Sequence, residues 1–361
     1  MNKKQAFKIV IFAAVFLYLL QSLTYIIRTN GDVKDRFVGF YAEKKNSVDV
    51  IMIGSSPVYP CFSGPQIWGE YGITCYPLSS NVQRPQAALG LVREAQKTQS
   101  PDLYVFEIKQ FASDFNEDSD SMAYTRGVTD NLKYSWNRII TINDMVSDAS
   151  DRYTFYFDIF KYHSNWKTMV LPSQIRCFRY EYPDPWKGFV QKAGIHPAEY
   201  VDYSAIEEQT PIPDYNENSL RELLAYLKEH DLNALFVLAP YQLESDIKQK
   251  NFNYMESIIS ESGYEFLNLN EHLTEMDFDF EEDFYDKGVH TNAVGSKKCS
   301  AYLAEYMLET YQIKDKRGDQ AYQSWDLAYE KWLSGYGEAE KQIKEAIRNQ
   351  VYTEVQEEDE E

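Results

Sequence analysis

The sequence predicts an α/β fold, a parallel sheet with helices on both faces, preceded by one membrane-spanning helix. Two observations predict the sheet: buried runs of strand length recur along the chain, and helical segments alternate with them. A third observation predicts the anchor, because the first apolar run is far longer than a strand. The chain has 361 residues, of which 44% are hydrophobic, so it is long enough for one large α/β domain or two small ones.

The anchor is the uncharged and mostly apolar run Ile9–Ile27. At about 1.5 Å per residue it nearly crosses a hydrocarbon core of about 30 Å. Lysines precede the run and none lies within it, which favours a cytoplasmic N-terminus, although basic residues that follow the run weaken this bias. No small-residue cleavage site follows, so a retained anchor is favoured over a removed signal peptide. We therefore expect a single-pass protein of the cell membrane, with residues 1–28 as start and anchor and 29–46 as a polar joint.

The remainder is expected to lie outside the cytoplasm. Four buried runs are predicted strands: Val48–Ile53, Leu103–Ile108, Ala234–Ala239 and Tyr264–Leu269. Segments with helical spacing lie between and after them: residues 88–97, Ser219–His230, Phe252–Ser262, Ser296–Tyr311 and the amphipathic Ala321–Arg348. We expect residues 47–313 to form one domain and residues 314–361 a helical tail with an acidic end.

Residues 131–210 are rich in Tyr, Trp and Pro and show no regular periodicity. We interpret them as an aromatic insertion or lid over the sheet. Tyrosine and tryptophan rings stack on sugars, so this segment is expected to bind glycan, with Trp166 in contact with the polymer. His163 lies beside it in the segment KYHSNW (161–166), where it could contact substrate or pack as a structural histidine.

Charge and cysteine content exclude several classes of function. The net charge is −20, with 56 acidic and 36 basic residues and no basic stripe, so no nucleic-acid partner is expected. The four cysteines form no C-x-x-C pair, and neither a metal nor a cofactor is predicted. Cys61 and Cys75 could pair in an exported domain, but buried free thiols are favoured.

The first strand ends on Gly54-Ser55-Ser56, followed at once by Pro57. Glycine permits a sharp turn and proline holds the residue before it extended, so the turn can present a serine hydroxyl to solvent. A serine needs a base, usually a histidine that an acid orients. DFYDKGVHTNAVG (283–295) supplies both, because Asp286 and His290 share a loop just before the last predicted helix. In an open parallel sheet such loops can meet at the carboxyl ends of the strands.

These segments resemble the SGNH hydrolase superfamily. Gly54-Ser55-Ser56 is similar to its Gly-Asp-Ser block, with Ser56 in the place of the nucleophile, and Asp286 to His290 is similar to its Asp-x-x-His block. The chain looks more narrowly like the membrane-anchored branch with the teichoic acid D-alanyl transfer proteins (DltD) and polysaccharide O-acetylation proteins. That likeness also covers KYHSNW, LFVLAPYQ (235–242) and KDKRGDQAYQSW (314–325).

The resemblance implies an SGNH-like three-layer fold and a serine, histidine and acid at Ser56, His290 and Asp286. Three residues separate Asp286 from His290 where the family has two, which makes Asp283 an alternative acid. CYPLSSNVQ (75–83) replaces the block that supplies the oxyanion glycine, so Ser79 and Ser80 are oxyanion candidates. The family's Gly-x-Asn-Asp block is missing at VFEIKQF (105–111), which leaves Asn81 as the nearby polar substitute.

Two functions are therefore expected from different classes. The first is serine-dependent transfer of an acetyl or D-alanyl group, or ester hydrolysis, on a cell-surface polysaccharide or teichoic acid, with a multi-span membrane acyltransferase as partner. The second is a non-catalytic SGNH-like protein that binds a glycan or a partner in the cell envelope. A soluble small-ester hydrolase is disfavoured by the anchor.

Overall fold

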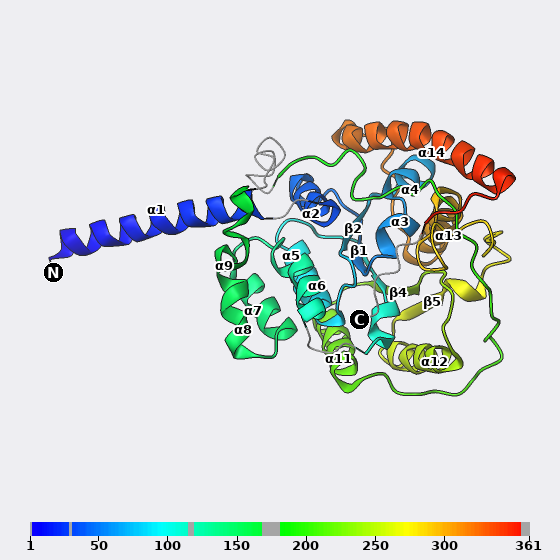
Figure 1. Ribbon diagram of the computed structural model, residues 1–361, viewed down its shortest axis with the longest axis horizontal. Coiled ribbons are helices and arrows are strands. Elements are labelled where there is room, and N and C mark those ends of the chain that lie inside the picture. Colours follow the sequence, from blue (N-terminus) through cyan, green and yellow to red (C-terminus); the bar gives the residue numbers. More distant parts are fainter. Residues whose placement is uncertain (1, 29–30, 115–118, 168–180, 355–361) are drawn as a thin grey trace.

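The computed structural model describes residues 2–28, 31–114, 119–167 and 181–354 (Figure 1). Within this part of the chain five parallel strands form one sheet with the order β2-β1-β3-β4-β5. The strands are β1 (Val50–Gly54), β2 (Cys75–Ser79), β3 (Leu103–Glu107), β4 (Ala234–Leu238) and β5 (Glu265–Asn268). The predicted α/β class with a parallel sheet is confirmed.

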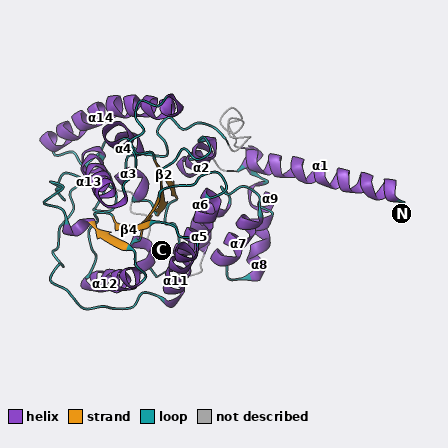
Figure 2. Cartoon of the chain, turned by 180° about the vertical axis from the view of Figure 1, so that it is seen from behind, coloured by secondary structure: helices purple, strands orange, loops and turns teal. Residues whose placement is uncertain are grey.

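Helices cover both faces of the sheet, which gives three layers (Figure 2). Alternate side chains of β1 face opposite ways, with Ile51 and Ile53 in one core and Val50 and Met52 in the other. The first core is shared with α2 (Asp32–Ala42), α5 (Ala88–Ala95), α11 (Asp214–Glu229) and α12 (Asp246–Glu261). The second core is shared with α3 (Val58–Cys61), α4 (Gly64–Tyr71) and α13 (Ala293–Tyr311). Short 3₁₀ turns are η1 (Pro85–Ala87), η2 (Lys109–Ala112), η4 (Leu269–Glu271) and η5 (Gln320–Tyr322).

Helix α1 (Lys3–Ile27) extends away from the body of the molecule (Figure 1). Its first turn is closed by a capping box, in which Asn2 and Gln5 exchange hydrogen bonds. With a mean hydropathy of 2.2 over its most apolar window, it is the one described helix long and apolar enough to cross a membrane.

The segments on either side of the predicted domain belong to its packing. The expected joint at 29–46 contains α2, whose Phe37 and Phe40 are buried in the core. The expected tail forms α14 (Gln323–Asn349), which lies along α4 and buries Trp325 and Trp332. The acidic end, residues 355–361, lies outside the described residues.

The aromatic insertion differs from the expectation in its first half. It forms α7 (Trp136–Met145), α8 (Ala149–Tyr156), α9 (Ile159–Tyr162) and the turn η3 (Asn165–Lys167), preceded by α6 (Ser119–Thr129). These helices pack beside α5 and the end of α1, so they do not form a lid over the sheet (Figure 1). The second described part, residues 181–213, lacks helices and strands as expected.

The cysteines do not form the bridge that an exported domain allowed. Cys61, Cys75 and Cys299 are buried free thiols, and Cys61 lies beside Cys299 in the second core. Burial raises the pKa of the Cys75 and Cys299 thiols well above the ordinary value, so both stay protonated. Cys177 lies outside the described residues.

Candidate active site

The sheet reverses its winding between β1 and β3, because β2 lies on one side of β1 and the later strands lie on the other. Loops that leave two such strands run in opposite directions and open a crevice at their carboxyl ends. Ser55 and Ser56 follow β1 at this point, and Glu107 and Lys109 stand at the end of β3. The sheet topology thus places these four residues at the same edge of the sheet, after two neighbouring strands.

The turn after β1 separates its two serines. Ser55 is only 1% exposed, and its Oγ has no hydrogen-bond partner among the described residues, whereas Ser56 is half-buried at the surface. Gly54 is required by close packing, because a Cβ there would lie 2.7 Å from Cβ of Glu107. Ser56 is therefore the serine that a substrate could reach.

His290 and Asp286 form a hydrogen-bonded pair in the loop before α13. Nδ1 of His290 lies 2.5 Å from Oδ2 of Asp286, while Oδ1 of Asp286 accepts from the backbone N–H groups of Val289 and His290 at 3.0 and 2.8 Å. Gly288 makes this turn with φ +79°, and its carbonyl accepts from the N–H of Gln242 across 2.7 Å. The additional residue between acid and histidine is thus accommodated by a glycine in the left-handed region.

This pairing orients the imidazole as a base. With Nδ1–H donating to the carboxylate, the lone pair remains on Nε2, which is shielded from solvent and has no hydrogen-bond partner among the described residues. Burial raises the pKa of Asp286, but the hydrogen bonds and charge of His290 outweigh burial and leave that pKa below its ordinary value. Asp286 is therefore ionised at neutral pH and can stabilise an imidazolium.

The serine and histidine loops lie against each other. Thr291, next to His290, donates from Oγ1 to the carbonyl of Pro60, four residues after Ser56, across 3.1 Å. The negative charge of Asp286 is one of those that raise the pKa of Lys109 at the end of β3 against the effect of burial. The predicted Ser56–His290 hydrogen bond is not formed in the described structure, since Nε2 has no partner.

Asp283 is not the acid that orients His290. Its Oδ2 accepts from Lys298 Nζ at 2.8 Å and from the backbone N–H of Asp279 at 2.7 Å, and the residue is fully buried. These contacts give Asp283 a role in holding the loop, and the geometry favours Asp286 between the two candidates.

The three oxyanion candidates differ in accessibility. Ser79 and Ser80 are fully buried, and Ser80 Oγ donates to Gln83 Oε1 at 3.3 Å. Asn81 is exposed, and its Oδ1 accepts from Tyr59 Oη at 2.9 Å, so its Nδ2 remains available to donate. The guanidinium of Arg36 lies 3.9 Å from the centre of the Tyr59 ring and supports this arrangement. Asn81 is thus the most accessible of the three.

Glu107 and Lys109 are site residues that sequence reasoning missed. Burial raises the pKa of Glu107 to about 7, partly offset by the backbone N–H and the charge of Lys109. Burial lowers the pKa of Lys109, partly offset by Glu107, and its Nζ lies 4.6 Å from the centre of the Tyr241 ring. The available signal was a carboxylate and an amine interrupting the apolar run VFEIKQF at a strand end.

His163 and Trp166 do not belong to this site. His163 ends α9, with its Nδ1 3.0 Å from the carbonyl of Phe160, and Trp166 is 63% exposed in η3. Asn165 between them donates to the carbonyl of Ile27, which places this segment at the end of α1 and far from α13 (Figure 1). Both side chains therefore lie away from the loops of Ser56 and His290, and their contact with a substrate polymer stays a prediction.

Comparison with known proteins gives no family for the chain. No protein-family model matches it, and no curated protein matches it. Among the described residues, no group of three or more His, Cys, Asp and Glu side chains could hold a metal ion.

Proposed function

We propose that the protein is a membrane-anchored, SGNH-like acyltransferase or esterase that acts on an ester-linked acyl group of a cell-surface polysaccharide or teichoic acid. The observation that carries the proposal is the Asp286–His290 pair, in which the carboxylate orients the imidazole and the histidine loop contacts the loop of Ser56. A single-pass anchor, α1, with the domain outside the cytoplasm, and a multi-span membrane acyltransferase as partner belong to the same proposal.

In the proposed reaction Ser56 Oγ attacks the acyl carbonyl while His290 Nε2 takes the hydroxyl proton. The imidazolium that forms is stabilised by the ionised Asp286. His290 then returns the proton to the leaving alkoxide, which departs as an alcohol and leaves an acyl ester on Ser56. A glycan hydroxyl or a water molecule attacks this ester in the second step, again with His290 as base, and regenerates Ser56.

The developing oxyanion needs hydrogen-bond donors at the same crevice. Asn81 Nδ2 and Lys109 Nζ are the available donors, and Lys109 adds a positive charge. The raised pKa of Glu107 leaves part of this carboxyl neutral near pH 7, which reduces the negative charge beside the developing oxyanion.

The proposal is tested by labelling the full-length protein with a fluorophosphonate and by measuring hydrolysis of a small acetyl ester. Ser56→Ala should abolish both, whereas Ser55→Ala, at the neighbouring serine, should retain labelling. His290→Ala should abolish turnover as well, and the double variant Ser56→Ala/His290→Ala should lose no more than either single variant, because the pair acts as one unit. Labelling that persists in Ser56→Ala would exclude Ser56 as the nucleophile.

A second function is favoured by one specific observation. Nε2 of His290 has no partner among the described residues, and Ser56 forms no hydrogen bond there. A non-catalytic protein that binds a glycan or an envelope partner at the same crevice has no need for that bond. Wild-type protein that neither labels nor hydrolyses an acyl ester, yet binds the polymer, would favour this second function.

A further inference from the structure

Helix α7 buries polar side chains and exposes apolar ones. Asn137, Arg138 and Thr141 are buried, whereas Trp136 is 79% exposed and Ile139 and Ile140 also lie at the surface. Exposed aromatic rings continue this surface over α8, α9 and η3. The exposed apolar side chains of these elements are here called the apolar patch: Trp136, Ile139, Ile140, Tyr153, Phe157, Phe160 and Trp166. Such a surface on a folded domain indicates an interaction with another apolar phase.

The patch is continuous with α1. A hollow of about 640 Å³ lies among Trp136, Ile139 and Phe157. Phe157 also lines a second hollow, of about 240 Å³, whose opposite wall is made by Leu17 and Leu20 of α1. Gln21, Thr24 and Asp158 also line the second hollow, so the apolar surface reaches α1 beside a few polar side chains.

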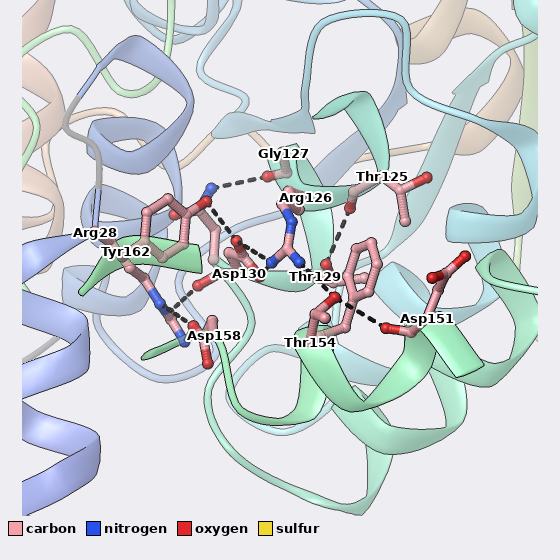
Figure 3. Close-up of polar contacts among 12 residues, drawn as sticks. Arg28, Thr125, Arg126, Gly127, Thr129, Asp130, Asp151, Thr154, Asp158 and Tyr162 are labelled. Carbon is pink, nitrogen blue, oxygen red and sulfur yellow. Dashed lines mark hydrogen bonds and ion pairs between the residues drawn. The ribbon is translucent and has the colours of Figure 1, made fainter. Parts of the chain in front are cut away.

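A buried ionic network fixes this arrangement (Figure 3). Arg28, directly after α1, donates from Nε to Asp158 Oδ2 at 2.5 Å and from Nη1 to the carbonyl of Asp130. Asp130 also accepts from Tyr162 Oη at 2.6 Å and pairs with Arg126 at 3.3 Å. The side chains of Arg28 and Asp158 are 2% and 0% exposed, so water does not compete with their ion pair. The pair and its neighbours therefore hold α6 to α9 and the end of α1 as one unit.

The length of α1 sets the depth of the patch in a bilayer. Lys8 and Arg28 are the charged residues that bracket its apolar run, and about 30 Å of helix separates them, which is the thickness of a hydrocarbon core. Leu17 and Leu20 then lie about 12 to 17 Å below Arg28. Phe157 shares a hollow with both, so it lies below the level at which α1 leaves the core.

We propose that the apolar patch is inserted into the leaflet on the domain's side of the membrane, where lipid acyl chains cover it. The inference rests on the proposed function in one respect only, that α1 spans a bilayer. Trp136 and Trp166 suit this position, because amphipathic aromatic rings concentrate at the boundary between headgroups and acyl chains. A second copy of the chain or a multi-span partner on the patch is an alternative outcome of the test.

The test uses the tryptophans of the full-length protein in phosphatidylcholine vesicles with brominated acyl chains. Bromine quenches an indole only at close contact, and of the six tryptophans Trp136 and Trp166 lie on the patch. Wild type should be quenched relative to vesicles of unbrominated lipid. Trp136→Phe should lose a large part of this quenching, and Trp136→Phe/Trp166→Phe nearly all of it. The matched control is Trp186→Phe, at a half-buried tryptophan packed near α14, which should keep the wild-type quenching.

Three results would overturn the inference. Wild type that floats with the vesicles but is quenched by aqueous acrylamide, and not by bromine, would place the patch in water. Wild type that floats but is quenched by neither, and that migrates as a dimer or with a second protein, would place protein on the patch. Wild type that does not float would show that α1 is no anchor. The ester assay at Ser56 is independent of all three, so failure of the patch and failure of the proposed chemistry are distinguishable.

Discussion

Nδ1 of His290 lies 2.5 Å from Oδ2 of Asp286, and the other ring nitrogen has no partner among the described residues. The pair leaves one nitrogen of the imidazole as an acceptor with a fixed orientation. Three parts of the site can be changed separately: the acid Asp286, the turn at Gly288 and the carboxyl of Glu107.

Asp286→Asn should lower kcat for a small acyl ester by roughly 10³–10⁴-fold, a smaller loss than that of His290→Ala, because the amide no longer fixes the tautomer. Asp283→Asn is the control, three residues away. It should cost about 1–3 kcal/mol of unfolding free energy, because Lys298 loses a charged acceptor, while activity stays within about tenfold of wild type. A larger kinetic loss in Asp283→Asn than in Asp286→Asn would make Asp283 the acid.

Gly288→Ala should abolish turnover through the shape of the loop. The residue has φ +79°, and an added Cβ would lie 2.5 Å from Cβ of Gln242 and 3.0 Å from Cβ of Ala198. The control is Gly263→Ala, where φ is +84° and nothing lies within 4 Å. Both variants should lose about 1–3 kcal/mol of stability from the left-handed backbone, but only Gly288→Ala should lose activity. Equal activities in the two variants would mean that the loop tolerates the displacement of His290.

Glu107 predicts a pH dependence of stability. Its pKa is about 7 in the folded protein against an ordinary 4.5, so the folded state keeps the proton after the unfolded chain has lost it. The stability contributed by this group is complete below about pH 4.5 and is lost as pH rises through about 7, by at most about 3 kcal/mol. In denaturant titrations from pH 4 to 8, the difference in unfolding free energy between wild type and Glu107→Gln should fall with pH. The exposed control Glu229→Gln should show a constant difference; a constant difference for Glu107→Gln as well would show that its pKa is not raised.

The orientation of the anchor is tested by a reporter that is active only in the cytoplasm, fused after Glu361. The lysines before the apolar run predict a silent reporter. A reporter that works only outside the cytoplasm, fused at the same position, should be active and serves as the control for expression. A strong cytoplasmic signal would exclude both the orientation and a cell-surface substrate.

The strands show what the sequence pattern could and could not predict. The buried runs that became β1, β3, β4 and β5 were predicted within about two residues, because predominantly apolar stretches are typical of parallel strands. β2 was missed, since Pro77 stands in its middle and argues against a central strand. The structure explains why a proline is tolerated there: β2 is the edge strand of the sheet, and Pro77 pairs with Met52 on one side only.

Helix α7 was missed for a different reason. Periodicity predicts a helix when the apolar stripe is separated from polar residues, but the buried face of α7 carries Asn137, Arg138 and Thr141 as well as Ile142. Asn137 Nδ2 donates to the carbonyl of Gly90 and Arg138 Nε to that of Thr129, so these two buried donors have partners outside their own helix. Such partners are not visible in a local pattern.

In the candidate site, the rule that loops meet at the carboxyl ends of parallel strands predicts that the loops of Ser56 and His290 lie close together. The hydrogen bond from Thr291 to Pro60 shows that these two loops are in contact. The same rule applies to the end of β3, where Glu107 and Lys109 stand in place of the family's Gly-x-Asn-Asp block. The aromatic neighbours of His163 and Trp166 make both residues candidates for substrate contact, but such neighbours carry no information about the distance to Ser56. Both Asp286 and Asp283 fit the sequence pattern, and the hydrogen bond from His290 to Asp286 distinguishes them.

The contacts of Arg28 restrict how the domain can move relative to α1, which determines how it would meet the proposed substrate. A domain on a flexible linker samples a volume around its anchor point. Here Arg28 is held by Asp158 and by the carbonyl of Asp130, so the domain cannot rotate freely about the end of α1. In a bilayer, the crevice at Ser56 would then travel at one constant height as the whole molecule diffuses laterally. Encounter becomes a two-dimensional process, and along a polymer that rises from the surface only the units passing at that height can be modified.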